Sequence, residues 1–392
     1  MPSKELPVSR IRLVPPALDD PQDHAALRGE VRGFLRDCLD SAVFTPGIDT
    51  WLTGWDPAFS TLLAARGWIG MTIPTTYGGH GRSHLERFAV TEELLAAGAP
   101  VAAHWIADRQ IAPSLLKFGT EQQKQRFLPA ITRGECFFGI GMSEPDSGSD
   151  LASVRTKAVR VEGGWAITGT KVWTSGAHHA DAFIALARTA PKDPAVRHAG
   201  LSQFIVELRS PGVEIRPIIS MTGSHHFNEV VLEEVFVPDD MVLGTIGDGW
   251  LQVTSELAYE RSGPERFLST FALLAETLDQ VAAERLRSNG DIGRLTARIA
   301  GLHHMSSSVA GALHRGERAD SAAAAVKLLG TATEGDIADY VDVLADRDAH
   351  ACDAGHFAEL IDQAILQRPG FTLRGGTNEI LEGVVARELG LR

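Results

Sequence analysis

Apolar residues recur at helical spacing in the first third of the chain, because side chains three or four residues apart share one face of a helix. One such stripe consists of Leu27, Val31, Phe34, Leu35 and Leu39. The same pattern extends from about residue 22 to residue 135. Further helices are predicted at 57–66, 84–98 and 102–118. This part of the chain is therefore predicted to be all-helical.

Local sequence signals indicate where one of these helices begins and where a loop lies. Thr120 stands three residues before Gln123, an arrangement in which each side chain can bond a free amide at a helix start. The run Pro74-Thr75-Thr76-Tyr77-Gly78-Gly79 is typical of a turn or loop. A helix is thus expected to begin after Thr120, and a loop is expected to separate two earlier helices.

From about residue 136 to residue 245 the pattern changes to short runs of β-branched and aromatic residues separated by Gly, Asp and Pro. Strands are predicted at 137–142, 154–161, 165–170, 182–187, 203–208, 213–217 and 229–237. Glu162-Gly163-Gly164, between two of these runs, indicates a hairpin.

Helical periodicity returns after Gly249 and continues nearly to the end of the chain. The predicted class is α+β, with an all-helical domain at 1–135, a small β-sheet domain resembling a barrel at 136–247, and a helical domain of the four-helix-bundle type at 248–392.

Composition narrows the function classes. The 392 residues carry 37 Lys and Arg against 50 Asp and Glu, a net charge of −13 that argues against nucleic acid and against a basic membrane-surface helix. No run reaches the length of a membrane span, and the N-terminal residues MPSKELPVSR lack the apolar segment of a signal peptide. Cys38, Cys136 and Cys352 are odd in number and scattered, so no disulfide framework is indicated. We expect a cytoplasmic protein.

Generic sequence motifs indicate neither a dinucleotide-binding fold nor a metal site. Gly139-Ile140-Gly141 begins like a dinucleotide fingerprint, but Glu144 replaces the third glycine and no βαβ unit surrounds it. Histidine pairs occur at 178/179, 225/226 and 303/304, and adjacent side chains diverge on a strand or a helix. No metal site is predicted, and these histidines are interpreted as ordinary loop or surface residues.

A specific signal lies in residues 137–189, FFGIGMSEPDSGSDLASVRTKAVRVEGGWAITGTKVWTSGAHHADAFIALART, which resemble the acyl-CoA dehydrogenase family. The segments PTTYGG and GTEQQKQRFLPAITRGE before it, and FNEVVLEEVFVPDDMVLG and RGGTNEI after it, follow in that family's order. The family's architecture of helices, sheet and helices also matches the pattern above. The resemblance covers nearly the whole chain.

The resemblance implies FAD as cofactor and assigns residues to it. Ile140, Met142 and Ser143 match positions that offer backbone amides and a hydroxyl to the pyrimidine edge of the flavin. Trp173 and Ser175 match positions that cover the isoalloxazine and bond near its hydride-accepting nitrogen.

Further positions follow from the same resemblance. Gly148 and Ser149 match a turn that contacts flavin or acyl-CoA phosphates, Ser149 being assigned to the substrate. Thr377 and Glu379 match positions near the adenine end of FAD. Taken singly, a turn glycine or a capping hydroxyl would have a purely structural explanation.

The catalytic base is the clearest departure from the usual pattern. α,β-Dehydrogenation of an acyl thioester needs a carboxylate that removes the α-proton, and much of the family places it where this chain has Gly375. Other branches place it on a helix of the C-terminal domain, beside an arginine, where this chain has Glu260 and Arg261. The resemblance thus implies Glu260 as the base and Arg261 at the substrate. Without it, Glu260 would be interpreted as part of an exposed charged helix.

Two stretches that meet a neighbouring subunit's FAD in the family are altered. The Arg-x-x-Phe-Gly stretch is replaced by AAERLRSNG at 282–290, and the Gly-Gly-x-Gly stretch by ACDAGHF at 351–357. Either a homo-oligomer holds the FAD diphosphate through Arg285 or Arg287, or a paralogous subunit in a heteromer supplies the missing contacts.

The resemblance therefore implies an FAD-dependent acyl-CoA dehydrogenase that forms a trans-2-enoyl-CoA and passes electrons to an electron-transfer flavoprotein. Two alternatives stay open: a flavin-dependent monooxygenase or oxidase on the same fold, and a partner subunit of a heteromeric acyl-CoA dehydrogenase. Glu260 argues against the first, because oxygen chemistry needs no such base.

Overall fold

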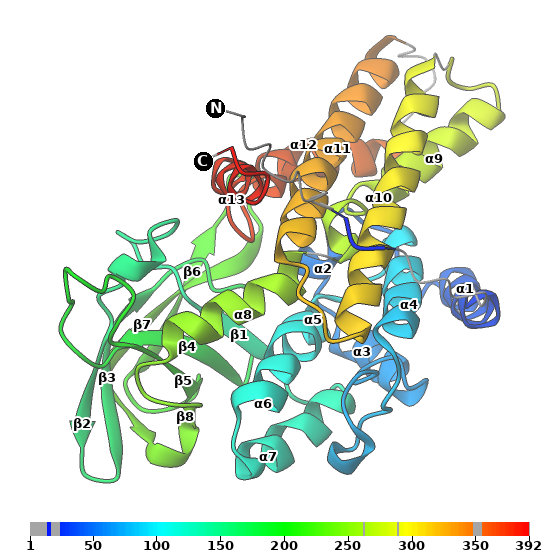
Figure 1. The fold of residues 1–392 in the computed structure, drawn as a ribbon. Coiled ribbons are helices and arrows are strands. Elements are labelled where there is room, and N and C mark those ends of the chain that lie inside the picture. The colour runs from blue at the N-terminus through cyan, green and yellow to red at the C-terminus, as the bar shows by residue number, and fades with distance from the viewer. Residues whose placement is uncertain (1–13, 17–23, 262, 288–289, 348–354, 392) are drawn as a thin grey trace, which may run out of the picture.

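The computed structural model describes residues 14–16, 24–261, 263–287, 290–347 and 355–391, without the side chains of 256–260 and 347. A sheet occupies one side of the molecule, and the long helices of the C-terminal part stand on the other (Figure 1). The predicted order of helices, sheet and helices is confirmed, and with it the α+β class. Among the described residues, none of the helices is long and apolar enough to cross a membrane.

The N-terminal helices follow the predicted pattern. They are α1 (Ala25–Asp40), α2 (Thr50–Thr53), α3 (Pro57–Ala65), α4 (His84–Ala96), α5 (Ala102–Ile106), α6 (Ala112–Phe118) and α7 (Glu121–Thr132). A π-helical turn, Ala107–Ile111, joins α5 to α6. The predicted capping box is present at α7, where the Thr120 hydroxyl accepts from the Gln123 amide at 3.2 Å and Gln123 bonds back to the Thr120 amide at 3.0 Å.

The sheet has eight strands: β1 (Phe138–Gly141), β2 (Lys157–Val161), β3 (Gly164–Lys171), β4 (Ala182–Arg188), β5 (Leu201–Glu207), β6 (Val213–Ile219), β7 (His225–Pro238) and β8 (Val242–Leu243). Their order is β6-β7-β3-β2-β4-β5-β8, and β1 pairs with β4 in parallel. The predicted hairpin is confirmed, since Val161 pairs with Gly164. β7 begins four residues earlier than predicted.

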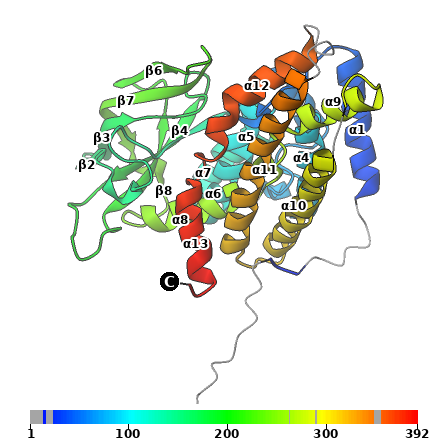
Figure 2. The same ribbon diagram turned by 90° about the horizontal axis from the view of Figure 1, so that it is seen from above.

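The last part contains α8 (Gly249–Arg261), α9 (Phe271–Ala282), α10 (Gly290–His314), α11 (Asp320–Arg347), α12 (His356–Phe371) and α13 (Asn378–Glu388). α8 contacts both β5 and α11, and so lies between the sheet and the C-terminal helices (Figure 2). A separate 3-10 turn, Pro264–Arg266, begins after α8 ends at Arg261. Pro264 lacks an amide hydrogen and is favoured at the start of a new turn.

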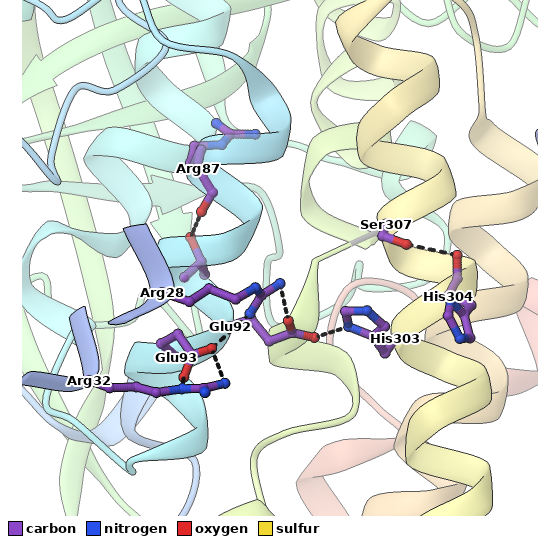
Figure 3. Close-up of polar contacts among 9 residues, drawn as sticks. Arg28, Arg32, Arg87, Glu92, Glu93, His303, His304 and Ser307 are labelled. Carbon is purple, nitrogen blue, oxygen red and sulfur yellow. Dashed lines mark hydrogen bonds and ion pairs between the residues drawn. The ribbon is translucent and has the colours of Figure 1, made fainter. Parts of the chain in front are cut away.

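Ion pairs join the N-terminal and C-terminal helices through α4 (Figure 3). Arg28 of α1 reaches Glu92 at 2.7 Å and Glu93 at 2.9 Å. The other oxygen of Glu92 lies 2.6 Å from Nδ1 of His303 on α10. Glu92 is thus shared between α1 and α10, which fixes α4 against both.

Candidate functional site

The end of β1 is the first of the predicted flavin-binding segments. Gly141 lets this strand approach β4 closely, because a Cβ at Gly141 would lie 2.3 Å from the Phe183 ring. The chain then leaves the sheet at Met142 and Ser143, both half-buried. The Ser143 carbonyl accepts from the Val172 amide at 3.0 Å, which joins this segment to the one that contains Trp173.

Trp173 follows β3 and has an unusual backbone. Its φ is +61°, which is rare for a bulky residue and tends to occur at functional positions. Its side chain is 57% exposed and meets the edge of Phe227 with ring centroids 5.6 Å apart. Reciprocal backbone bonds of 3.0 and 3.1 Å between Thr174 and Asn228 fix the segment. The chain therefore holds a large aromatic side chain outward, where it can cover a planar ring.

The turn with Gly148 and Ser149 is exposed. A Cβ at Gly148 would meet nothing within 4 Å, so open space lies beside it. Asp150, which follows, bonds the Ser153 hydroxyl and pairs with Arg197, and these contacts hold the pKa of its carboxyl below the usual range. Arg197 brings positive charge to the turn.

The C-terminal end of α8 meets the turn before α13. Nε of Arg261 donates to the Gly375 carbonyl at 2.9 Å. Gly375 and Gly376 both have positive φ, +66° and +92°, and a Cβ on Gly376 would lie 3.1 Å from Nη2 of Arg261. The backbone of Glu260 belongs to α8, and its side chain lies outside the described part of the structure.

Thr377 and Glu379 begin α13. The Thr377 hydroxyl accepts from the Ile380 amide at 3.5 Å, so it caps the helix. Glu379 is exposed, and bonds to its own amide and to Thr377 lower the pKa of its carboxyl. Thr377, one of the predicted cofactor contacts, therefore also has a structural role as the N-cap of α13.

A buried polar cluster that no sequence pattern indicates lies next to the turn at 374–377. Arg374 pairs with Asp49 and lies over the ring of Trp51, 4.9 Å from the ring centroid. Glu334 of α11 accepts from the Ser269 amide at 2.8 Å, and burial raises the pKa of Glu334 to about 7. Asp49 also has a positive φ, +59°. These residues come from four distant parts of the chain, which is why no local pattern joins them.

His178 and His179 lie in a turn and His225 is exposed, as predicted for loop or surface residues, and their rings also stack on neighbours. His178 stacks on His225 with ring centroids 3.9 Å apart, and Trp55 stacks on His179 at 5.2 Å. Burial and the neighbouring imidazoles lower the pKa of His178 to about 4. The pairs His178/His179 and His225/His226 lie far apart in the sequence. Their stacking could therefore be found only from the tertiary structure. Among the described residues, no group of three or more His, Cys, Asp or Glu could hold a metal ion.

The two altered stretches are described only in part. Residues 288–289 and 351–354 lie outside the described residues. Arg285 is exposed, and its Nε donates to the Gln280 side chain. Arg287 is exposed too.

The comparison with protein families settles the relationship. A model described as "Acyl-CoA dehydrogenase, N-terminal domain" matches residues 21–135, and one described as "Acyl-CoA dehydrogenase, middle domain" matches residues 139–235, more than half of the chain together. The chain belongs to the acyl-CoA dehydrogenase family. Its matched relatives are named as dehydrogenases, which are oxidoreductases.

Two curated relatives from Mycobacterium tuberculosis match this chain over only part of their length. Acyl-CoA dehydrogenase FadE34 is 46% identical over 202 residues, which is 51% of this chain and 27% of the relative. Acyl-CoA dehydrogenase IpdE1 is 40% identical over 246 residues, 61% of this chain and 63% of the relative. The matches thus span between about a quarter and two thirds of these curated relatives.

A solved structure gives fuller coverage. The acyl-CoA dehydrogenase described as "Tcur3481-Tcur3483 steroid ACAD" superposes with a TM-score of 0.81 and 30% identity, over 93% of this chain and 96% of that chain. The whole architecture, including the C-terminal helices, is therefore shared with that member of the family.

Proposed function

We propose that the protein is an FAD-dependent acyl-CoA dehydrogenase that converts an acyl-CoA thioester to its trans-2-enoyl-CoA, with Glu260 as the base. The contact between Arg261 and the Gly375 carbonyl carries this proposal. It brings the end of α8 against the turn that holds the base in much of the family. Gly375 has no side chain, and Glu260 directly precedes Arg261 on α8, so we assign the role of the base to Glu260.

In this proposal Glu260 removes the α-proton of the thioester, and FAD, when bound, would supply the acceptor for the hydride of the β-carbon. Arg261 ties the end of its helix to the turn at 374–377, so the base is held on a fixed element. A base within hydrogen-bond reach of its proton contributes typically 10²–10⁴-fold to the rate.

The residues present fit the ring half of FAD. The end of β1 provides the Met142 and Ser143 backbone, and Trp173 stands outward on a strained backbone beside Ser175. Thr174, between these two, is fully buried and bonded to Asn228, so the segment is rigid. These residues would hold the isoalloxazine at its pyrimidine edge and along one face, and exclude water from it.

The phosphate half has a less complete set of contacts, and we propose that a second subunit completes it. Arg285 and Arg287 are exposed, and Nε of Arg285 already donates to the Gln280 side chain. The solved relative named above is described by two protein names. A heteromer with a paralogous chain is therefore the assembly we favour over a homo-oligomer.

The acyl group is proposed to be bulky. α8 ends at Arg261, and a new turn begins at Pro264. In this proposal the break helps to shape the wall of the acyl pocket. The relative of known structure is described as a "steroid ACAD". Ser149 and Arg261 are the proposed substrate contacts, an electron-transfer flavoprotein is the proposed acceptor, and the cytoplasm is the proposed compartment.

The test is anaerobic bleaching of the bound flavin by a panel of acyl-CoA thioesters, namely straight-chain, branched and steroid side-chain thioesters. Bleaching together with the appearance of enoyl-CoA supports the proposal, and the strongest response is expected for a bulky member. Oxygen uptake that depends on a supplied flavin reductant, without enoyl-CoA, would point to a monooxygenase or oxidase. No flavin reduction even with a partner subunit would leave a non-catalytic role.

A further inference from the structure

Lys171 is a cation buried at the end of β3, and the proposed function gives it no task. Its side chain is fully buried. Nζ donates to the Met142 carbonyl at 3.1 Å and to Oε1 of Glu144 at 2.8 Å. A lysine so placed is rare, because removing an ammonium from water is costly unless it is paired and hydrogen-bonded.

Glu144 completes the arrangement on the other side. Its Oε2 accepts from the Arg155 amide at 2.6 Å and its Oε1 from the Thr156 amide at 2.9 Å. Burial alone would raise the pKa of Glu144, but Lys171 and these bonds lower it below the usual range. Burial lowers the pKa of Lys171 to about 8 although Glu144 opposes the shift, so the pair is charged at neutral pH. It ties the ends of β1, β3 and β2 together at the segment 142–156.

The bond to Met142 has a consequence for the next residue. The Met142 carbonyl and the Ser143 amide belong to one peptide unit, and in a trans peptide they point in opposite directions. Lys171 binds the carbonyl from within the sheet, so the Ser143 amide is directed away from it. The Val172 amide holds the Ser143 carbonyl at 3.0 Å, which fixes the following peptide too.

An ammonium on a carbonyl oxygen also polarises the peptide. Hydrogen bonds in a chain strengthen one another, and the effect is larger where water is excluded. The Ser143 amide is consequently a stronger donor than it would be beside a solvated carbonyl. It lies where the resemblance places the pyrimidine edge of the flavin.

We propose that Lys171 is a positioning residue for FAD: through the Met142–Ser143 peptide it orients and polarises an amide that stabilises the negative charge the flavin ring gains on reduction. Lys171 thereby raises the reduction potential of the bound cofactor without touching it. This inference rests on the flavin assignment made under the proposed function. Trp173 follows Lys171 by only two residues. The end of β3 would thus position contacts to both the edge and the face of the flavin ring.

The test is the midpoint potential of bound FAD, measured by chemical reduction against a reference dye, which needs no acyl-CoA. Lys171→Met alone would leave Glu144 as an unpaired buried charge, so the main variant is Lys171→Met with Glu144→Gln. We expect this double variant to bind FAD and its midpoint potential to be more negative than that of the wild type by about 30 mV. For a two-electron couple this corresponds to a change of about tenfold in the equilibrium constant for reduction. Lys171→Arg keeps the positive charge, so the midpoint potential of this variant should lie close to that of the wild type.

The control is Arg160→Gln. Arg160 pairs with Asp239 near the other end of the β2–β3 hairpin and is largely exposed. Its substitution should leave the potential and the FAD affinity unchanged. An unchanged potential in the double variant with FAD bound, or an equal shift in Arg160→Gln, would overturn the inference.

The two proposals fail differently. If the wild-type protein binds FAD but no acyl-CoA reduces it, the dehydrogenase proposal fails, while the potentials still decide the role of Lys171. If the protein binds no FAD even when FAD is in excess, both are overturned.

Discussion

Nε of Arg261 lies 2.9 Å from the carbonyl oxygen of Gly375, a bond that spans 114 positions of the chain. It joins the end of α8 to the turn before α13. The position beside the proposed base is thus tied to the position where the base stands in other members of the family. The fit depends on glycine at 375 and 376, where φ is positive.

Gly376→Ala should therefore destabilise the protein. The new Cβ would lie 3.1 Å from Nη2 of Arg261, and φ there is +92°, so a cost of about 1–3 kcal/mol is expected. Denaturant unfolding measures it. Gly301→Ala in α10 is the matched control, because a Cβ there meets nothing within 4 Å and alanine favours the helix. Equal stability of the two variants would contradict this account of the turn.

Trp173→Ala should weaken FAD binding much more than it lowers the melting temperature. The side chain is 57% exposed, so it contributes little to the core, whereas covering the flavin ring uses its whole face. We expect a loss of at least about tenfold in FAD affinity, or about 1.4 kcal/mol, by fluorescence titration. Phe236→Ala removes an aromatic side chain of similar exposure, 53%, from β7. Similar FAD affinities for both variants would remove Trp173 from the flavin site.

Glu334→Gln should stabilise the protein at high pH but not at low pH. The pKa of Glu334 is raised, mainly by burial, to about 7. Between its ordinary value near 4.5 and this value, the folded protein keeps a proton that the unfolded chain has released, so wild-type stability falls as pH rises through that window. Glutamine is neutral throughout.

The gain for Glu334→Gln at pH 8 should reach on the order of 3 kcal/mol, and should be close to zero near pH 4.5. Unfolding curves at several pH values measure the difference. A difference that is constant with pH would show that Glu334 is already ionised in the folded protein. The nearby Asp49 and Arg374 are present in both proteins, so their own effects largely cancel.

The flavin content of the chain expressed alone tests the assembly. If a paralogous subunit supplies contacts to the FAD diphosphate, the isolated chain should retain less than one FAD per chain after gel filtration, and coexpression with the partner should restore it. Absorbance of the released flavin against protein concentration gives the ratio. One FAD for each chain in the isolated protein would favour a homo-oligomer.

How much the sequence predicts depends on how local the cause is. The Thr120–Gln123 capping box and the hairpin at Glu162 and Gly163 were predicted because each depends on residues within a few positions. The order of helices and strands followed from periodicity in the same way. The break after α8 has a local cause too, because a separate turn begins at Pro264 after α8 has ended at Arg261.

The expectations for the site came only from the family motifs. Lys171 belongs to a residue type that is usually exposed, and its partner Glu144 is 27 positions away, so no spacing rule could join them. Asp49, Glu334 and Arg374 come together only through the packing of α2, α11 and the turn at 374–377. Contacts of this kind are set by the tertiary fold, not by the local pattern.

Anaerobic flavin bleaching by a reactive acyl-CoA in Glu260→Gln tests the central claim most directly. Glu256→Gln, about one turn earlier on α8, is the control that keeps the helix and changes the same type of side chain. We predict that both variants bind FAD, that Glu256→Gln bleaches like the wild type, and that Glu260→Gln loses bleaching by at least about 10²-fold, the lower end of what a general base contributes. Bleaching of Glu260→Gln at the wild-type rate would contradict the assignment of the base.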